Sequence, residues 1–456
     1  MYPNANSIIS SVQWPALASG IQAELMSLQF QLQQHEHLSP KKIQQLQLKQ
    51  LSRLVTHADS STDFYSRYYR QKGYQPLTEI TEENLLSIPL LTRDDLQSAG
   101  DSIHSKSVPL EHVVSGEITT SGSTGKPITV KTTQVSQFIG YALTLRDHRW
   151  HQRDLNKKLC VIKYFGQGAK PPHGTKYDHW SLATSAIYDT GPSVCLSISA
   201  TVSEQFDWLV FEKPYYLLTY PSNLLELITY AKNNNLHFPK LKEIRTLGEV
   251  VTDQLRTVCS EELGLSVADA YSCQELGYLA IQCPKHDHYH VQCENVLLEV
   301  INADGEPCKA GETGKVVISS LNNFASPLIR YDIGDYAQVG EPCDCGIKLP
   351  VLNKIMGRER NMVTYPDGNK RWPFVGSSQF RSIADIRQFQ IIQHAIDSVE
   401  VKLVVADKLS FEQESSLIRV IQAALMFPFK ITFSYPPKIE RSAGGKYEDF
   451  ISMVTT

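Results

Sequence analysis

The sequence predicts an α/β fold in two parts: a large N-terminal α/β domain with a β-rich subdomain, residues 1–356, and a small α+β C-terminal domain, residues 357–456. Three observations predict this. The 456 residues are too many for one small core. Short apolar runs alternate with helical patterns between residues 113 and 352. After Gly357 the pattern restarts as strand, strand, helix, strand over about a hundred residues, enough for a separate domain.

Composition excludes several classes of protein. Charged residues make up 20% of the chain and the formal net charge is -4, whereas a nucleic-acid-binding protein normally carries a basic surplus. The N-terminus lacks the basic and apolar pattern of a signal peptide, and no apolar run is long enough to span a bilayer. Nine cysteines without a secretory signal predict a reducing, cytoplasmic location with thiols that are free or metal-bound.

Residues 20–56 are rich in Gln, Leu and Lys, with apolar residues at helical spacing on both sides of "LSP", residues 38–40. This pattern predicts two helices, which we expect to pack as an N-terminal cap.

Elements of the α/β body follow. "KLCVIKYF" and "YYLLTY" are typical of buried strands. Two helices are expected next, one opened by Ser222 and one closed by Gly264. "NVLLEVI", "GKVVISSL" and "YAQVG" then predict strands of the β-rich part. In the C-terminal domain the predicted elements are the strands "FQIIQ" and "SVEVKLVVA", the helix "SFEQESSLIRVIQAALM" and the strand "KITFSYP".

The stretch "EITTSGSTGKPITVKTT", residues 117–133, packs hydroxyls, glycines and a lysine into one loop. Backbone N–H groups freed by glycine, together with hydroxyls and an ammonium, suit an anion such as a phosphate chain. The loop is not a Walker motif, because Pro127 follows Lys126 and "ITVKTT" alternates like a strand. It therefore joins two strands. An ordinary Ser/Gly surface turn is the alternative.

Further segments change the balance between these alternatives. They are "RTLGEVV" (residues 245–251), "DAYSCQELG" (269–277), "PLIRYDIGD" (327–335), "IMGRER" (355–360) and "RSAGGKYEDF" (441–450). With "TTSGSTGKP" they resemble, in order, the motifs of the acyl-adenylate-forming superfamily, in particular its phenylacetate–CoA ligase-like branch. The resemblance extends over nearly the whole chain from about Leu38.

The resemblance implies an AMP-forming acid ligase. Such an enzyme joins a carboxylic acid, here expected to be aromatic, to ATP, giving an acyl-adenylate and pyrophosphate. A carboxylate is already ionised at neutral pH, so this step needs positioning and charge stabilisation rather than a general base. The acyl group then passes to a thiol, most often CoA. A carrier-protein thiol or an amine is an alternative acceptor, and a non-catalytic nucleotide-binding homologue is an alternative from another class.

Carried over residue by residue, the resemblance places the β- and γ-phosphates on one loop. Its members are Ser121, Gly122, Ser123, Thr124, Gly125 and Lys126. Glu275 would hold Mg²⁺, a hard ion that favours oxygen ligands; a surface helix carboxylate is the alternative. Tyr271, with Ser272 beside it, would flank the adenine, and Gly248 and Glu249 would line its other side. Tyr271 is otherwise expected as a core residue.

The ribose and the reacting phosphate involve three more residues. Asp335 would accept hydrogen bonds from the ribose hydroxyls, and Arg358 would assist at the ribose or phosphate. Lys446, on a Gly-Gly loop of the C-terminal domain, would approach the α-phosphate and the acyl oxygens; an ordinary solvated lysine is the alternative.

Two features depart from phenylacetate–CoA ligases proper. The pivot for rotation of the small domain is normally Asp or Lys, and Arg360 stands there. The segment that follows, "VTYPDGNKRWPF", resembles the corresponding segment of family members that act in capsule and secondary-metabolite pathways. Both departures concern transfer to CoA more than adenylation.

A cysteine and histidine cluster adds a metal prediction. "CPKHDHYHVQCE" and the later Cys-x-Cys turn "PCDCG" supply the donors. Similar positions in relatives point to a structural Zn²⁺ held by Cys283, His290, Cys343 and Cys345, a closed set of four ligands. Free thiols beside histidines of an exposed loop are the alternative.

Overall fold

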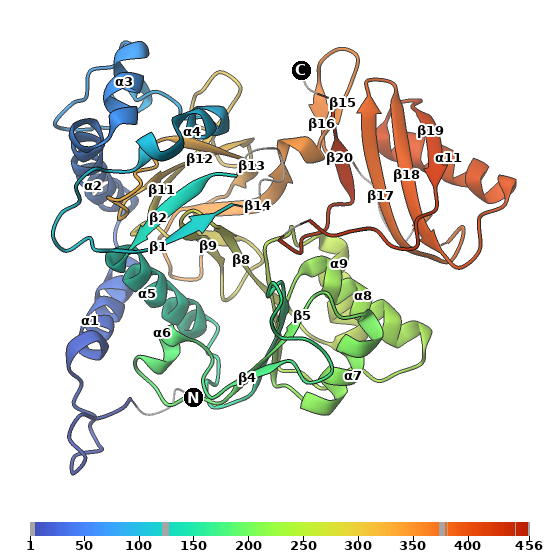
Figure 1. Cartoon of the computed structure of the whole chain (residues 1–456), viewed down its shortest axis with the longest axis horizontal. Helices are drawn as coiled ribbons and strands as arrows, with labels where there is room; N and C mark the ends of the chain where they lie inside the picture. Colours follow the sequence, from blue (N-terminus) through green and yellow to red (C-terminus); the bar gives the residue numbers. More distant parts are fainter. Residues whose placement is uncertain (1–4, 121–126, 374–378, 381, 443, 455–456) are drawn as a thin grey trace. The chain divides into compact units, whose positions relative to one another are not determined.

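The computed structural model describes residues 5–120, 127–373, 379–380, 382–442 and 444–454. The chain divides into two compact units, Met1–Met356 and Gly357–Thr456, and the division falls inside strand β14 (Val351–Arg358). Both units combine helices with sheet, which confirms the predicted α/β class (Figure 1).

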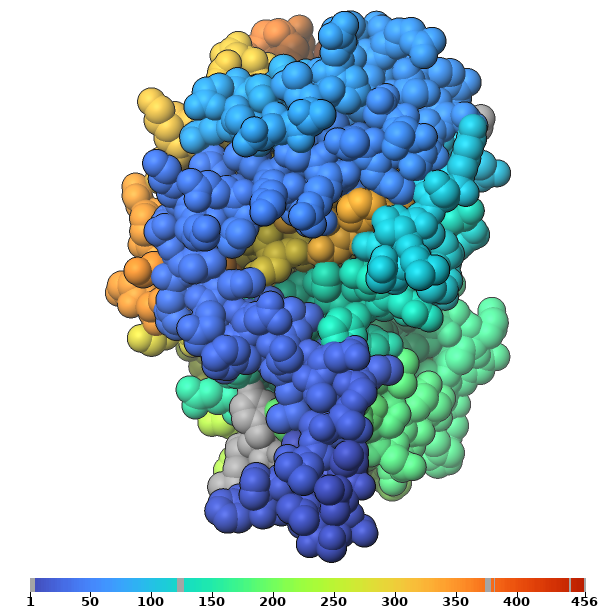
Figure 2. All heavy atoms as spheres, turned by 90° about the vertical axis from the view of Figure 1, so that its left-hand side faces the viewer, coloured from blue at the N-terminus to red at the C-terminus, as the bar shows by residue number. Residues whose placement is uncertain are grey.

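Three helices begin the first unit: α1 (Gly20–His35), α2 (Pro40–Ser61) and α3 (Asp63–Gln71). The predicted pair of helices is confirmed, and "LSP" is the break between them. The Ser39 side chain accepts a hydrogen bond from the Lys42 N–H, and Pro40 takes the first turn, where its missing N–H costs nothing. Figure 2 shows these helices, in blue, covering one face of the molecule.

One twelve-stranded sheet forms the centre of the first unit, in the order β11-β12-β13-β14-β10-β9-β8-β7-β6-β3-β5-β4 among the residues described. Strands β8, β7, β6, β3 and β5 are parallel neighbours, and the remaining pairings that carry a register are antiparallel. The β-rich part predicted from sequence therefore continues the same sheet. The further bounds are β3 (Leu159–Lys163), β4 (Thr175–Tyr177), β5 (Ser193–Ser197), β6 (Tyr216–Thr219), β7 (Glu243–Leu247), β8 (Val267–Cys273), β9 (Gly277–Gln282), β10 (Tyr289–Val291), β11 (Val296–Ile301), β12 (Thr313–Ser320) and β13 (Tyr331–Val339).

The parallel block carries α7 (Val202–Glu212), α8 (Pro221–Asn233) and α9 (Asp253–Val258) (Figure 1). The prediction that Ser222 opens α8 is wrong, because Pro221 is its first residue and Tyr220 its cap. The following helix continues past α9 through a π-turn, η3 (Cys259–Leu263), and ends at Gly264 as predicted. Gly264 has φ 64°, a conformation that glycine adopts without strain.

Shorter elements complete this unit. The hairpin β1 (Val114–Thr119) and β2 (Thr129–Thr133) is antiparallel, as the alternating "ITVKTT" predicted, and leads directly into α5 (Gln134–Trp150). The others are η1 (Leu85–Ser87), α4 (Arg93–Ala99), η2 (Gly100–Ile103) and α6 (Leu182–Ser185).

The second unit is a four-stranded sheet in the order β19-β18-β17-β20, with α11 (Phe411–Leu425) packed on it. Its strands are β17 (Ile386–Ala395), β18 (Ser398–Val405), β19 (Lys430–Ser434) and β20 (Phe450–Ser452); η4 (Glu359–Asn361) and the small pair β15 (Val363–Thr364) and β16 (Lys370–Arg371) precede them. The predicted strand–strand–helix–strand order is confirmed. The parallel strand β20 was not predicted.

In the part of the chain that the structure describes, no helix combines the length and the hydrophobicity needed to cross a bilayer.

Candidate functional site

The hairpin β1–β2 carries the predicted phosphate loop at its tip. The loop residues Ser121, Gly122, Ser123, Thr124, Gly125 and Lys126 lie outside the described residues. The base of the loop is described: the N–H of buried Thr120 donates to the Ile128 carbonyl at 2.9 Å, and the Ile128 N–H donates to the Thr120 hydroxyl oxygen at 3.0 Å. These two bonds hold the ends of the loop together.

Tyr271 and Asp335 are brought together from strands β8 and β13. The Tyr271 hydroxyl donates a hydrogen bond to Asp335 Oδ2 at 2.9 Å, and the tyrosine is 7% exposed. Tyr271 thus packs in the core while its hydroxyl orients the carboxylate. A carboxylate can accept several hydrogen bonds at once, so this contact is compatible with further acceptance from a ribose. Ser272 is the next residue of β8 and is half-buried.

Glu275 lies in the turn between β8 and β9, not on a helix, and is half-buried. Burial raises the pKa of the neighbouring Cys273 thiol, and the negative charge of Glu275 raises it further. Burial and then Glu275 likewise raise the pKa of the Tyr331 hydroxyl. The charges of Glu275 and Asp335 both act on the Cys273 thiol, and that of Glu275 acts on Tyr331 as well.

Arg93 and Tyr331 belong to this neighbourhood but were not predicted. The charge of Arg93 lowers the pKa of the Tyr331 hydroxyl, against the larger raising effect of burial, and Arg93 Nη2 lies 3.4 Å from the Thr120 hydroxyl at the base of the phosphate loop. Its Nε is buried without a hydrogen-bond partner among the described atoms. The bridge between Leu91 and Tyr331 brings these distant segments together. The sequence around Arg93 marks only a helix start, so nothing in it signalled a contact with the loop.

Gly248 and Glu249 follow the carboxyl end of β7. Gly248 has φ 77°, the left-handed region, and turns the chain there. Glu249 Oε2 accepts a hydrogen bond from the Ser222 N–H at 2.9 Å. Because Tyr220 offers no side-chain cap, Glu249 caps α8 from another segment. Glu249 therefore has a structural role at the edge where the parallel strands β7 and β8 end, the usual ligand-binding edge of such sheets.

Lys446 and Arg358 lie in the second unit, so the structure describes them apart from the residues above. Lys446 closes a turn: its N–H donates to the Ser442 hydroxyl at 3.1 Å, and its carbonyl accepts from the Ser442 N–H at 2.8 Å. Arg358 is the last residue of β14, and its N–H donates to Asn361 Oδ1 at 3.2 Å.

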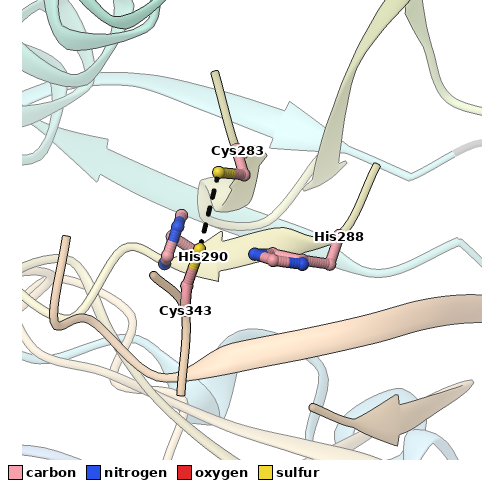
Figure 3. A group of neighbouring side chains, drawn as sticks. All are labelled: Cys283, His288, His290 and Cys343. Atoms are coloured by element: carbon pink, nitrogen blue, oxygen red, sulfur yellow. Dashed lines mark hydrogen bonds between the residues drawn. The ribbon is translucent and has the colours of Figure 1, made fainter. Parts of the chain in front are cut away.

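The predicted zinc ligands come together from two segments. Cys283 Sγ lies 3.8 Å from Cys343 Sγ, and His290 Nε2 lies 3.3 Å from Cys345 Sγ. Figure 3 shows Cys283, His290 and Cys343 converging, with His288 beside them. Zn–S bonds of about 2.3 Å in a tetrahedron place two sulfurs about 3.8 Å apart, so the Cys283–Cys343 spacing fits a zinc ion. All nine cysteines are free of disulfides.

Further hydrogen bonds suit this cluster to a metal. Backbone N–H groups of Cys345 and Ile347 point at the sulfurs of Cys343 and Cys345, at 3.3 and 3.4 Å. Burial raises the pKa of both thiols, and these hydrogen bonds lower it in part. The Nδ1 of buried His290 lies 3.3 Å from the Leu349 carbonyl, so it carries the proton and leaves Nε2 for the ion. Burial lowers the pKa of His290 to about 4, which keeps the ring neutral.

His288 lies in the cluster although it was not predicted as a ligand. Its donor atom lies within 4.8 Å of those of Cys283, His290 and Cys343, and its Nε2 is buried without a partner among the described atoms. Cys345 is outside this set of four, although its sulfur lies 3.3 Å from His290 Nε2. Sequence reasoning passed over it because the spacing in "HDHYH" cannot say which ring turns inward.

A separate groove runs beneath α2. Its lining mixes apolar residues with charges of both signs, among them Lys41, Lys49, Arg53, Glu79 and Glu83. None of the described residues predicted to bind nucleotide or metal lines this groove.

A protein-family model and several known proteins are similar in sequence to this chain. Residues 367–453 match the family described as the CapK C-terminal domain. The chain is 25% identical over 448 residues to the phenylacetate-coenzyme A ligase of Thermus thermophilus, covering 90% of this chain and 96% of that one. It is 24% identical over 310 residues to the phenylacetate-coenzyme A ligase of Escherichia coli, covering 67% and 69%.

Solved structures of ligases share the fold. A 2-hydroxyisobutyryl-CoA ligase in complex with 2-HIB-AMP superposes with a TM-score of 0.71 at 18% identity, covering 92% of this chain and 91% of that one. The anthranilate CoA ligase AuaEII with anthranoyl-AMP gives a TM-score of 0.54 at 15% identity, covering 74% and 66%. At these identities the likeness shows the fold alone. Together with the sequence relatives, it shows that the chain is similar to phenylacetate–CoA ligases and other AMP-forming acid–CoA ligases of the acyl-adenylate-forming superfamily, and that its C-terminal segment matches the CapK C-terminal domain family.

Proposed function

We propose that the protein activates a carboxylic acid with ATP, releases pyrophosphate, and passes the acyl group from the adenylate to the thiol of CoA. In this proposal the first unit binds ATP and the acid, and the second unit brings the lysine. The observation that carries it is the Tyr271–Asp335 hydrogen bond at 2.9 Å; the charges of Asp335 and Glu275 both act on Cys273, the last residue of β8. A ribose acceptor and a metal-binding carboxylate around one residue suit a nucleotide.

In the first step a carboxylate oxygen of the acid attacks the α-phosphorus of ATP, and the bond from that phosphorus to the β-phosphate oxygen breaks. Pyrophosphate leaves with the electron pair. Asp335 holds the ribose, Tyr271 and Ser272 flank one side of the adenine, and Gly248 with Glu249 flank the other. Lys446 neutralises charge on the α-phosphate and acyl oxygens, and Arg358 supports the ribose or phosphate.

The remaining phosphates need cationic and hydroxyl partners. The hairpin loop of Ser121, Gly122, Ser123, Thr124, Gly125 and Lys126 surrounds the β- and γ-phosphates in this proposal. Arg93, at the base of the loop, adds a planar guanidinium that pairs well with phosphate oxygens. Glu275 holds Mg²⁺, which supplies positive charge to the phosphate oxygens and the departing pyrophosphate.

In the second step the sulfur of CoA attacks the acyl carbon and the bond to the AMP oxygen breaks, so AMP leaves and a thioester remains. The names of the relatives support CoA as acceptor. Arg360, where Asp or Lys is usual, favours testing a carrier-protein thiol and an amine as well.

The acid is proposed to be aromatic, on the strength of the phenylacetate relatives. The fold alone does not restrict it, since the 2-hydroxyisobutyryl-CoA ligase superposes with a higher TM-score, 0.71, than the anthranilate CoA ligase, 0.54. Pyrophosphate release should be measured with phenylacetate, benzoates, anthranilate and 2-hydroxyisobutyrate, each with and without CoA. Acid-dependent release that one aryl acid supports best, followed by thioester formation, is expected. ATP binding without release by any acid would favour the non-catalytic homologue.

The cysteine and histidine cluster is proposed to hold a structural Zn²⁺ through Cys283, His290, Cys343 and Cys345. Four protein ligands leave no position for substrate, so the ion joins segments and takes no part in the reaction.

A further inference from the structure

Glu448, two residues after Lys446, is bound by the segment that joins the two units, residues 357–361, which we call the joining segment. Its Oε1 accepts hydrogen bonds from Arg360 Nε at 3.0 Å and from Asn361 Nδ2 at 3.1 Å. Its Oε2 accepts from Arg360 Nη2 at 2.5 Å. The arginine and glutamate side chains are only 18% and 20% exposed. Such a two-bond pairing needs the planar fork of arginine, which lysine does not offer.

The backbone that follows Lys446, at Glu448 and Asp449, is hydrogen-bonded to strand β17. Gln390 Nε2 donates to the Glu448 carbonyl at 3.1 Å, and the Ile391 N–H donates to the Asp449 carbonyl at 2.8 Å, so β17 fixes this stretch. Lys446 itself belongs to the turn closed by Ser442. The turn is therefore followed directly by backbone that is hydrogen-bonded to β17, and the Glu448 side chain links this backbone to η4.

The joining segment is bound to the second unit from Arg358 onward. Asn361 accepts from the Arg358 N–H at 3.2 Å and donates to the Phe450 carbonyl at 2.8 Å. Just before these contacts, Gly357 has φ 96°, a left-handed conformation that favours glycine.

We infer that Arg360, Asn361 and Glu448 form a clamp that orients the Lys446 turn and makes the joining segment move with it as one body. Arg360 and Glu448 are then positioning residues for adenylation, acting through Lys446. The inference rests on the proposed function, in which Lys446 meets the α-phosphate.

The clamp is tested by acid-dependent pyrophosphate release with Glu448→Ala and Arg360→Lys. Misplacing Lys446 by a fraction of an ångström to about 1 Å should lower kcat roughly 10- to 100-fold in Glu448→Ala, with KM for ATP nearly unchanged. Arg360→Lys keeps the positive charge but loses one of the two hydrogen bonds to Glu448, so its kcat should lie between those of the wild type and Glu448→Ala. Lys370→Ala is the matched control: it breaks the neighbouring pair with Glu359, 2.8 Å long, which does not touch Glu448. Its kcat should stay within about twofold of the wild type.

A double-mutant comparison separates positioning from general damage. If the clamp acts through Lys446, Glu448→Ala should cause no further loss in a Lys446→Ala background. An independent further loss, or an equal loss in Lys370→Ala, would overturn the clamp while leaving the adenylation proposal standing. A wild-type protein without acid-dependent release would overturn both. Should Glu448→Ala fail to fold, Glu448→Gln, which keeps the volume, serves in the same comparison.

Discussion

Lys446 is the residue of the second unit expected to contact the α-phosphate and the acyl oxygens. Lys446→Ala should lower acid-dependent pyrophosphate release roughly a hundredfold or more, because a charge contact made mainly in the transition state is lost. ATP affinity, measured by calorimetry, should stay close to that of the wild type. Lys438→Ala, on the same segment but paired in the open with Glu440, is the control and should be active. Near-normal adenylation by Lys446→Ala would refute the assignment.

Glu275 is the residue expected to bind Mg²⁺. Glu275→Gln should shift the Mg²⁺ concentration needed for half-maximal activity upward by about tenfold, because an amide brings no charge to the ion. Activity is measured across a Mg²⁺ titration. A loss by the same factor at limiting and saturating Mg²⁺ would show that Glu275 does not hold the metal.

At the residue scale, the sequence predicts which residues belong to the site better than it predicts which of them are in contact. Tyr271 and Asp335 were each predicted, and the structure shows that they touch. Arg93 and Tyr331 were missed because their contact depends on the Leu91–Tyr331 bridge, which no local pattern reveals. The capping of α8 by Glu249 was missed for the same reason, since cap and helix lie 27 residues apart.

At the scale of elements, α5 is fastened by buried ion pairs. Arg146, fully buried, lies 2.8 Å from Glu294 and 3.3 Å from Glu36 at the end of α1. Burial alone would raise the pKa of the Glu294 carboxyl, but Arg146 and His35 lower it, to about 2. A lowered folded pKa stabilises the protein above the unfolded value of about 4.3, and this stabilisation disappears as the pH falls toward about 2.

Glu294→Gln should therefore lower the free energy of unfolding by roughly 3 kcal/mol at pH 7, since it leaves Arg146 short of a charge partner. The difference from the wild type should shrink as the pH falls from about 4.5 toward about 2. Urea unfolding across this pH range measures it. Glu262→Gln, which breaks the exposed pair with Lys232, is the control and should change little. A difference independent of pH would contradict the account.

The zinc proposal concerns how two elements are joined. The ligands Cys283 and His290 flank the loop into β10, and Cys343 and Cys345 lie in the turn before β14. Purified protein should contain about one equivalent of zinc, and replacing both Cys343 and Cys345 by Ser should lower Tm and soluble yield, because the binding energy counts as folding energy. The kcat of the folded fraction should change much less. Cys308→Ser, a free thiol outside the cluster, is the control. Metal-free protein of unaltered stability would refute the idea.

Elements with a strong local signal were predictable. The two N-terminal helices, the hairpin β1–β2 and the order of elements in the second unit follow from periodicity and caps. The start of α8 was misplaced by one residue because Ser222 resembles a cap, whereas Pro221 in the first turn decides the boundary. That β11 to β13 extend one sheet was not predictable, since strand order depends on pairings distant in the chain.

At the scale of the whole molecule, we propose that the acid attacks the α-phosphorus of ATP. Two compact units fit this proposal, with the residues proposed to hold the adenine and ribose mainly in the first and Lys446 in the second. Their division within β14 gives a single joining segment, which the Arg360–Glu448 pair binds to the second unit.

The most direct test follows an oxygen atom. An acid that supports turnover is labelled with ¹⁸O in its carboxylate, and the nucleotide products are analysed by mass spectrometry. Attack on the α-phosphorus, followed by cleavage of the acyl–oxygen bond, leaves one labelled oxygen in AMP, and unlabelled pyrophosphate accompanies it. The account predicts this result. Label in orthophosphate together with ADP would show attack on the γ-phosphorus and would contradict it.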